Sequence, residues 1–169
     1  MTLGTRIVVM KDGVVQQVDT PQNLYNAPGN LFVAGFIGSP QMNFLDATVK
    51  VNGKDVTLQV GNYSLKLPEN KAKALIDGGY DGKTVVMGIR PENVTDDATA
   101  FPESTVEAKI NVYELLGAEV FLYFDVEGFN MTARVDPHTT SSTGDTVKFG
   151  LDMTKVHVFD KETELTITN

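Results

Sequence analysis

The sequence changes character at residues 38–40, Gly-Ser-Pro, and this break constrains the fold more than any other feature. Before it, the apolar segments are short and are divided by Pro21 and Pro28. After it, short apolar runs follow one another and are separated by turn dipeptides. Because glycine and proline interrupt regular secondary structure, we place a domain boundary here. The sequence therefore predicts two domains, residues 1–38 and 39–169.

A β-hairpin and two short helices are expected before the boundary. Apolar residues 7–10 and 14–18 flank the turn sequence Lys-Asp-Gly, which is the pattern of a hairpin. Thr-Pro at positions 20–21 starts a helix over residues 21–26, because threonine caps free amide groups and proline has none to satisfy. Proline at position 28 ends that helix. A second helix, over residues 30–37, is too short to be stable without packing.

Residues 39–169 are expected to consist mainly of β-strands. Asn52-Gly53 and Gly61-Asn62 separate the first three strands, and such dipeptides tolerate the positive φ angles of two-residue hairpins. In the long strand, Val106, Ala108, Ile110 and Val112 alternate with polar residues and should share one face. The expected strands cover residues 43–51, 55–60, 63–67, 83–89, 105–116, 120–126, 130–135, 147–151 and 156–159.

One helix interrupts these strands at residues 68–77, and residues 91–102 are expected to form a polar loop. The tail, residues 161–169, is expected either as an edge strand or as a frayed end. Many short strands joined by hairpins, with one inserted helix, indicate an OB-like Greek-key barrel. The predicted fold class is therefore mainly β, with a hairpin and two short helices preceding the barrel.

Composition and charge exclude several classes of function. The chain has no cysteine, which excludes a disulfide scaffold and thiolate metal sites. Its 14 Lys and Arg against 22 Asp and Glu give a net charge of −8, which argues against nucleic-acid partners. An OB-fold that binds nucleic acid would need stacking aromatics in a basic groove, and acidic residues surround the aromatic cluster of residues 121–124. The sequence shows no transmembrane segment and no signal peptide.

No catalytic, cofactor-binding or metal-binding residues are predicted. Residues 77–84, DGGYDGKT, superficially resemble a phosphate loop, but Asp77 occupies the place of the required glycine and a strand follows instead of a helix. His138 and His157 have no convergent partners in the sequence, so both are expected to be structural. Asp96 and Asp97 lack further oxygen ligands, so they do not indicate a metal site.

Three short motifs each allow two interpretations. Arg90, Pro91 and Glu92 end a strand, where they could form a simple turn with an exposed ion pair. Gly117 and Glu119 lie between two strands, where glycine would provide the positive φ of a tight turn. Phe44 begins a strand and could simply pack in a core. The alternative interpretations depend on a family resemblance.

The segment at residues 6–44, RIVVMKDGVVQQVDTPQNLYNAPGNLFVAGFIGSPQMNF, resembles the ATP-hydrolysing subunits of bacterial ABC importers for sugars, of the maltose and multiple-sugar type. In that family a strand, a DG turn and a second strand precede TPxxLYxxPxNxFVAxFIGSPxMNF. The sequences GIRPE at residues 88–92, LGAE at 116–119 and HVFD at 157–160 also resemble family motifs. The family's usual TG after the last motif is replaced by Thr163-Glu164.

The resemblance implies that residues 1–38 end a nucleotide-binding domain and that residues 39–169 form a TOBE-type regulatory and dimerisation domain. This domain would belong to a subunit that energises sugar import, in the cytoplasm and peripheral to the membrane. Its expected partners are a second copy, the membrane permease subunits and a sugar-system regulatory protein. The resemblance also implies a regulatory and dimer surface, to which it assigns Phe44, Arg90, Pro91, Glu92, Gly117 and Glu119.

The sequence contains no phosphate loop, LSGGQ-type signature or Walker B strand, so this chain is not expected to be an enzyme. ATP and Mg²⁺ would bind elsewhere in the longer protein. Since MTLGTRIVVM resembles the interior of longer family members, the native protein is expected to extend upstream of Met1. The alternative interpretation is a stand-alone OB-like domain that binds a small oxyanion, although the acidic composition argues against it.

Overall fold

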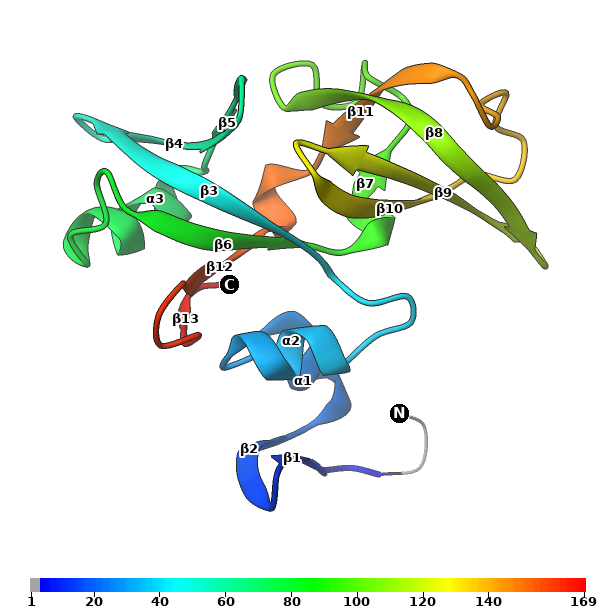
Figure 1. Ribbon diagram of the computed structural model, residues 1–169. Helices are drawn as coiled ribbons and strands as arrows, with labels where there is room; N and C mark the ends of the chain where they lie inside the picture. The colour runs from blue at the N-terminus through cyan, green and yellow to red at the C-terminus, as the bar shows by residue number, and fades with distance from the viewer. Residues whose placement is uncertain (1–3) are drawn as a thin grey trace.

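The structure, a computed structural model that describes residues 4–169, begins with the hairpin of β1 (Ile7–Lys11) and β2 (Val14–Asp19). Asp12 and Gly13 form its turn, with φ angles of 51° and 78°. The hairpin and the two helices that follow it lie below a barrel of strands (Figure 1). The expectation that the native protein extends upstream of Met1 concerns a part of the chain that lies outside the described residues.

The two predicted short helices are present and both start at a capping side chain. In α1 (Pro21–Asn26), the Thr20 hydroxyl accepts the amide hydrogen of Asn23 at 3.2 Å. In α2 (Leu31–Phe36), the Asn30 side chain accepts the amide hydrogen of Val33 at 2.9 Å. Neither helix is long enough to be stable alone, and both pack in a small hydrophobic cluster formed by Val9, Leu24, Val33 and Ile37.

The barrel is built from two sheets, and the predicted mainly β, OB-like fold is confirmed. Its sheets run β13-β12-β6-β3-β4-β5 and β10-β9-β8-β11-β7. One large hydrophobic cluster is shared by both sheets. The strands of the first sheet are β3 (Asn43–Asn52), β4 (Asp55–Val60), β5 (Tyr63–Lys66), β6 (Thr84–Ile89), β12 (His157–Asp160) and β13 (Thr166–Thr168). Those of the second are β7 (Val94–Thr95), β8 (Thr105–Leu116), β9 (Glu119–Val126), β10 (Phe129–Val135) and β11 (Thr146–Leu151).

Helix α3 (Glu69–Asp77) is the inserted helix, between β5 and β6. It buries Ala72 and Leu75 in the barrel cluster. Two short 3₁₀ helices, η1 (Pro91–Asn93) and η2 (Met153–Lys155), follow β6 and β11. The tail forms an edge strand, β13, next to β12.

Three local expectations were wrong. Val112 does not share the buried face of Val106, Ala108 and Ile110. It is 49% exposed, because a register shift between Ile110 and Val112 breaks the alternation of β8. The first barrel turn is Gly53-Lys54, since Asn52 already pairs with Asp55 and extends β3. The expected loop over residues 91–102 contains η1 and β7, whose Val94 is buried and pairs with β11.

The helices of residues 21–36 pack on the outer face of the first sheet. Ala34 of α2 shares a buried cluster with Val86 of β6 and Phe159 of β12. The chain's tail also reaches these helices, because the amide of Thr166 donates to the carbonyl oxygen of Gly29 at 3.1 Å. We call this region, where α1 and α2 meet β6, β12 and the tail, the helix–barrel junction.

Candidate functional site

Arg90 lies inside the helix–barrel junction. It follows β6 and is only 2% exposed. Its Nη1 donates to the carbonyl oxygen of Ile37 and its Nη2 to that of Tyr25, both at 2.8 Å. The guanidinium carbon lies 3.8 Å from the centroid of the Tyr25 ring. Arg90 therefore ties the ends of both short helices to the barrel.

The interpretation of residues 90–92 as a turn with an exposed Arg90–Glu92 ion pair was wrong, because the guanidinium is buried and both of its ends donate to carbonyl groups of the helices. Burial lowers the pKa of Arg90 to about 10, so the side chain remains charged at neutral pH. Its Nε is buried and makes no hydrogen bond to the described residues. Pro91 is also buried, in η1, and Glu92 is half-buried beside it.

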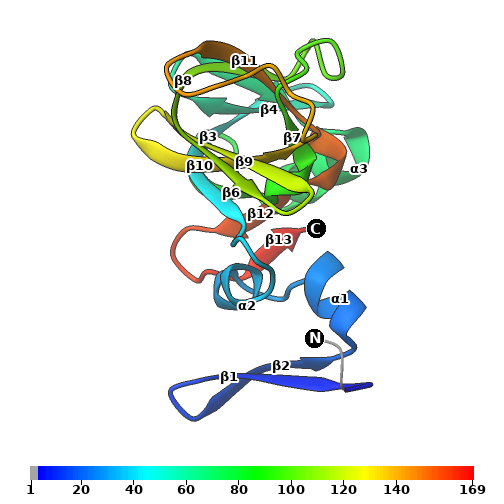
Figure 2. The same cartoon turned by 90° about the vertical axis from the view of Figure 1, so that its right-hand side faces the viewer.

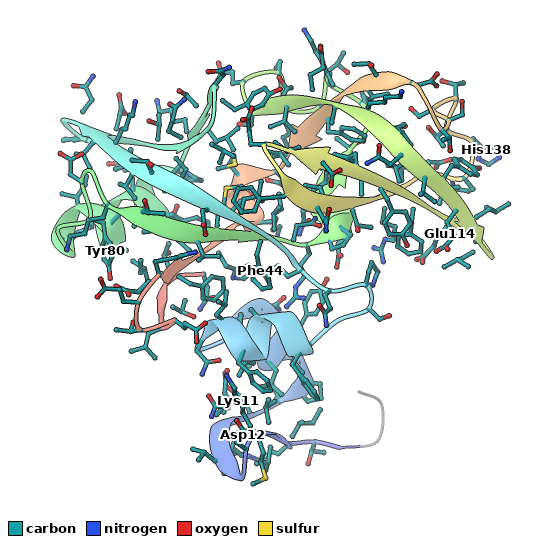
Figure 3. All side chains as sticks on the ribbon, in the orientation of Figure 1. Lys11, Asp12, Phe44, Tyr80, Glu114 and His138 are labelled. Carbon is teal, nitrogen blue, oxygen red and sulfur yellow. The ribbon has the colours of Figure 1, made fainter. Side chains whose placement is uncertain are left out.

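Phe44, at the start of β3, lies at the same junction, on the side that faces α2 (Figure 3). Its ring meets that of Phe159 edge-on, with centroids 6.0 Å apart. A Cβ atom on Gly35 of α2 would come within 3.3 Å of the Phe44 ring, so the helix packs closely here. Phe44 thus packs as an aromatic at a strand start, and it does so where the helices meet the barrel.

Gly117 and Glu119 lie at the tip of the β8–β9 hairpin, apart from the buried Arg90. Gly117 has a φ of 61°, as a tight turn requires. Glu119 pairs with Arg134 of β10, with 3.4 Å between Oε1 and Nη1, and both side chains are well exposed. Leu115 and Leu116 next to them are 56% and 53% exposed.

The tip is close to the segment that links the helices to the barrel. Ser39 and Pro40 of the linker line a shallow hollow of about 320 Å³ together with Leu116, Glu119 and Phe121. The six predicted residues therefore fall into two groups. Phe44 and Arg90 pack inside the junction, Pro91 and Glu92 follow Arg90 in η1, and Gly117 and Glu119 face solvent beside the linker.

A second cavity, of about 450 Å³, opens beside Arg90 and was not predicted from the sequence. We call it the junction cavity. Its cationic walls include Lys71 of α3, which is only 4% exposed, and Lys155 of η2. The full lining comprises Tyr25, Asn26, Lys71, Arg90, Glu92, Asn93, Thr154, Lys155, His157 and Asn169.

His157, on the wall of the junction cavity, is a buried neutral side chain. Its Nδ1 lies 2.9 Å from Oδ1 of Asn169. The pKa of His157 is lowered to about 4, mainly by burial and also by the nearby charges of Arg90 and Lys71, against the opposing effect of the contact with Asn169. The sequence suggested a structural histidine, and its packing next to Phe159 agrees with that interpretation.

Within residues 4–169, no three His, Asp or Glu side chains gather in a group that could hold a metal ion. None of the helices in the described part of the chain is long and apolar enough to cross a membrane.

Comparisons with known proteins agree with this architecture. A family model described as the MalK OB fold domain matches residues 38–94, and a TOBE domain model matches residues 87–159. The chain also has the fold of the molybdate-binding protein ModG. That solved structure has a TM-score of 0.53 and 15% identity, and the match covers 69% of this chain and 94% of ModG.

Several curated relatives match 99% of this chain, and two of them are named for sugar transport. The Bacillus subtilis oligosaccharides import ATP-binding protein MsmX is 44% identical, with 46% of its length covered. The Streptococcus mutans multiple sugar-binding transport ATP-binding protein MsmK is 40% identical, with 47% covered. The chain thus spans about half the length of these relatives. The chain therefore contains a MalK-type OB fold domain and a TOBE domain, and it is similar to about half of the length of these ATP-binding proteins.

Proposed function

We propose that this chain is the regulatory and dimerisation part of the ATP-binding subunit of a sugar importer. The observation that carries the proposal is the match of 99% of the chain to MsmX and MsmK, whose names specify oligosaccharide import and multiple-sugar transport. In this proposal, ATP and Mg²⁺ bind in the remaining half of the longer subunit, which also contacts the membrane permease subunits. The subunit would work at the inner face of the cell membrane.

The exposed apolar residues of the first hairpin support a longer subunit. Val8, Val14 and Val15 are 52%, 62% and 51% exposed, an unusual concentration on one small hairpin. The ATP-binding domain of the full subunit would cover this surface. The hairpin would then belong to that domain, and the helix–barrel junction would connect it to the regulatory barrel.

The tip of the β8–β9 hairpin is the surface that we assign to the second copy of the chain. It presents Val112, Leu115 and Leu116 at about half exposure, and Gly117 and Glu119 lie among them. Exposed apolar side chains beside polar ones are suited to a two-fold contact between copies. A sugar-system regulatory protein would dock nearby, at Glu119.

A chimera with MsmX tests the proposed function. The region of MsmX that aligns with this chain would be replaced by residues 4–169, and growth of Bacillus subtilis on oligosaccharides would be measured. We expect growth to be restored relative to a strain without MsmX. A chimera that is stable and hydrolyses ATP but supports no growth would contradict the proposal.

Sedimentation equilibrium tests the assigned dimer surface. We expect a weak dimer, which Leu116→Asp should dissociate and Val14→Asp on the first hairpin should leave intact. Monomer at every concentration would refute a self-sufficient dimer. If only Val14→Asp dissociates the dimer, the two copies make contact through the first hairpin and not through the tip of the β8–β9 hairpin.

A further inference from the structure

The junction cavity concentrates positive charge in an acidic protein. Among the side chains that line it, three are cationic, Lys71, Arg90 and Lys155, and one is a carboxylate, Glu92, whereas the whole chain carries a net charge of −8. It lies where α1, α3 and the C-terminal end of the chain come together (Figure 2). Its volume of about 450 Å³ is within the usual range of small-molecule sites.

Lys71 is the most unusual residue of this cavity. It is 4% exposed, yet its ammonium has no carboxylate within ion-pair distance among residues 4–169. Burial lowers the pKa of Lys71, and Lys155 nearby lowers it further. The carboxylate of Asp152 opposes this effect from a distance, while its Oδ1 accepts hydrogen bonds from Thr154. Most of the side chain is thus covered by the barrel, while its ammonium lines the cavity without an anionic partner in the described part of the chain.

Further unused donors surround Lys71. The Nε of Arg90 is buried without an acceptor, and Lys155 is exposed at the cavity rim. The side-chain amides of Asn26 and Asn93 can each donate a hydrogen bond, whereas the Thr154 hydroxyl already donates to Oδ1 of Asp152. Cationic donors suit the anionic group of a ligand, and neutral amide donors suit its hydroxyl groups.

We propose that the junction cavity binds a small metabolite that carries a phosphate or carboxylate group, with the Lys71 ammonium as the direct ligand of the anion. Lys155 contacts the anion from the rim, and Arg90 adds positive charge from the inner wall. The side chains of Asn26 and Asn93 bind the polar remainder of the molecule. The proposal goes beyond the proposed role in import and does not depend on it.

The position of the cavity gives the ligand a way to affect the helices. Tyr25 lines the cavity, stacks on Arg90 and accepts a hydrogen bond from it through its carbonyl oxygen. A bound anion therefore changes the electrostatic field at the residue that holds α1 and α2 to the barrel. We expect binding to strengthen this junction, because the anion neutralises charges that otherwise repel one another.

Isothermal titration calorimetry at low salt tests the proposal. The probes are inorganic phosphate, glucose 6-phosphate and gluconate, with uncharged glucose as the control ligand. We expect one saturable site for at least one anion and none for glucose. Binding of the two phosphates assigns the site to phosphate compounds, and binding of gluconate alone assigns it to carboxylates.

Two substitutions on the same helix separate a built site from general charge attraction. Lys71→Met should weaken binding at least tenfold, whereas Lys73→Met should leave it unchanged, because Lys73 is exposed and pairs with Asp77. Without ligand, Lys71→Met should raise the melting temperature by roughly 2–4 °C. If that variant does not fold, Lys155→Gln replaces it and should weaken binding several-fold. The absence of saturable binding, or equal losses in the Lys71 and Lys73 variants, would overturn the proposal.

Discussion

The helix–barrel junction and the tip of the β8–β9 hairpin differ in what their side chains contact. At the junction, Arg90 is 2% exposed and is held by two carbonyl oxygens and an aromatic ring. At the tip, Leu116 is 53% exposed and Glu119 makes one long ion pair across the surface. The resemblance to one family drew attention to both regions, yet the first is built to hold the fold and the second is available to partners.

Replacement of Arg90 tests this contrast most strongly. Arg90→Ala leaves the carbonyl groups of Tyr25 and Ile37 without their buried donor and removes the stacking on Tyr25. We expect a loss of about 3 kcal/mol in the free energy of unfolding. In a protein of this size, the melting temperature should fall by roughly 6–12 °C. Arg90→Lys should not rescue stability, because an ammonium cannot reproduce the planar fork.

Arg134 provides the matched control for Arg90. Its side chain is 39% exposed and pairs with Glu119 at the tip of the hairpin. Arg134→Ala should change the free energy of unfolding by no more than about 0.5 kcal/mol in urea titrations. Equal losses in the two arginine variants would remove the distinction between the two regions.

The pH dependence of stability should also originate at the junction. Folding lowers the pKa of His157 from 6.5 to about 4, so between these values the unfolded chain binds the additional proton. The contribution of neutral His157 is therefore complete above pH 6.5 and is lost as the pH falls to 4. It amounts to at most about 3 kcal/mol. The measurement is urea unfolding at a series of pH values.

His157→Gln identifies the origin of this pH dependence, because glutamine does not titrate. We expect the slope between pH 6.5 and 4 to flatten in this variant. Asp160 also has a lowered pKa, of about 2, owing to hydrogen bonds from Thr163 and Tyr80. The contribution of Asp160 to stability is lost only as the pH falls below its ordinary pKa of 3.8, so it does not overlap with the loss from His157 between pH 6.5 and 4. An unchanged slope in His157→Gln would show that other groups cause it.

At the hairpin tip, the backbone strain of one residue is the largest stability effect that we expect. Gly117 has a φ of 61°, but no atom lies within 4 Å of an added Cβ. Gly117→Ala should therefore cost about 1 kcal/mol from the backbone conformation alone. Gly117→Asn should cost less, because asparagine tolerates this conformation better. A loss larger than that of Arg90→Ala would contradict the contrast between the regions.

The parts of the fold that depend on neighbouring residues could be predicted from the sequence. The capping threonine at position 20 and the Asp12-Gly13 turn act within a few residues, so their patterns indicate their structures directly. The alternation in β8 failed at Val112 because a bulge depends on pairing with β9, which the single strand does not reveal.

The environment of Arg90 could not be predicted in the same way. Its carbonyl partners are 53 and 65 positions away in the sequence, so no local pattern specifies them. The junction cavity, in contrast, had a visible signal. Lys71 shares the buried face of α3 with Ala72 and Leu75, and a lysine at such a position is unusual enough to indicate a site.

Glu119 provides the smallest stability change and the sharpest functional test. Because its ion pair with Arg134 is long and exposed, Glu119→Ala should alter the free energy of unfolding by no more than about 0.5 kcal/mol. In the MsmX chimera, the same change should alter how sugar uptake responds to a preferred carbon source, if a regulator docks at the tip. Glu107→Ala, at the other end of β8, should alter neither property. A large loss of thermal stability in Glu119→Ala would instead mean that this glutamate serves the packing of the turn, and the hairpin tip would then resemble the junction.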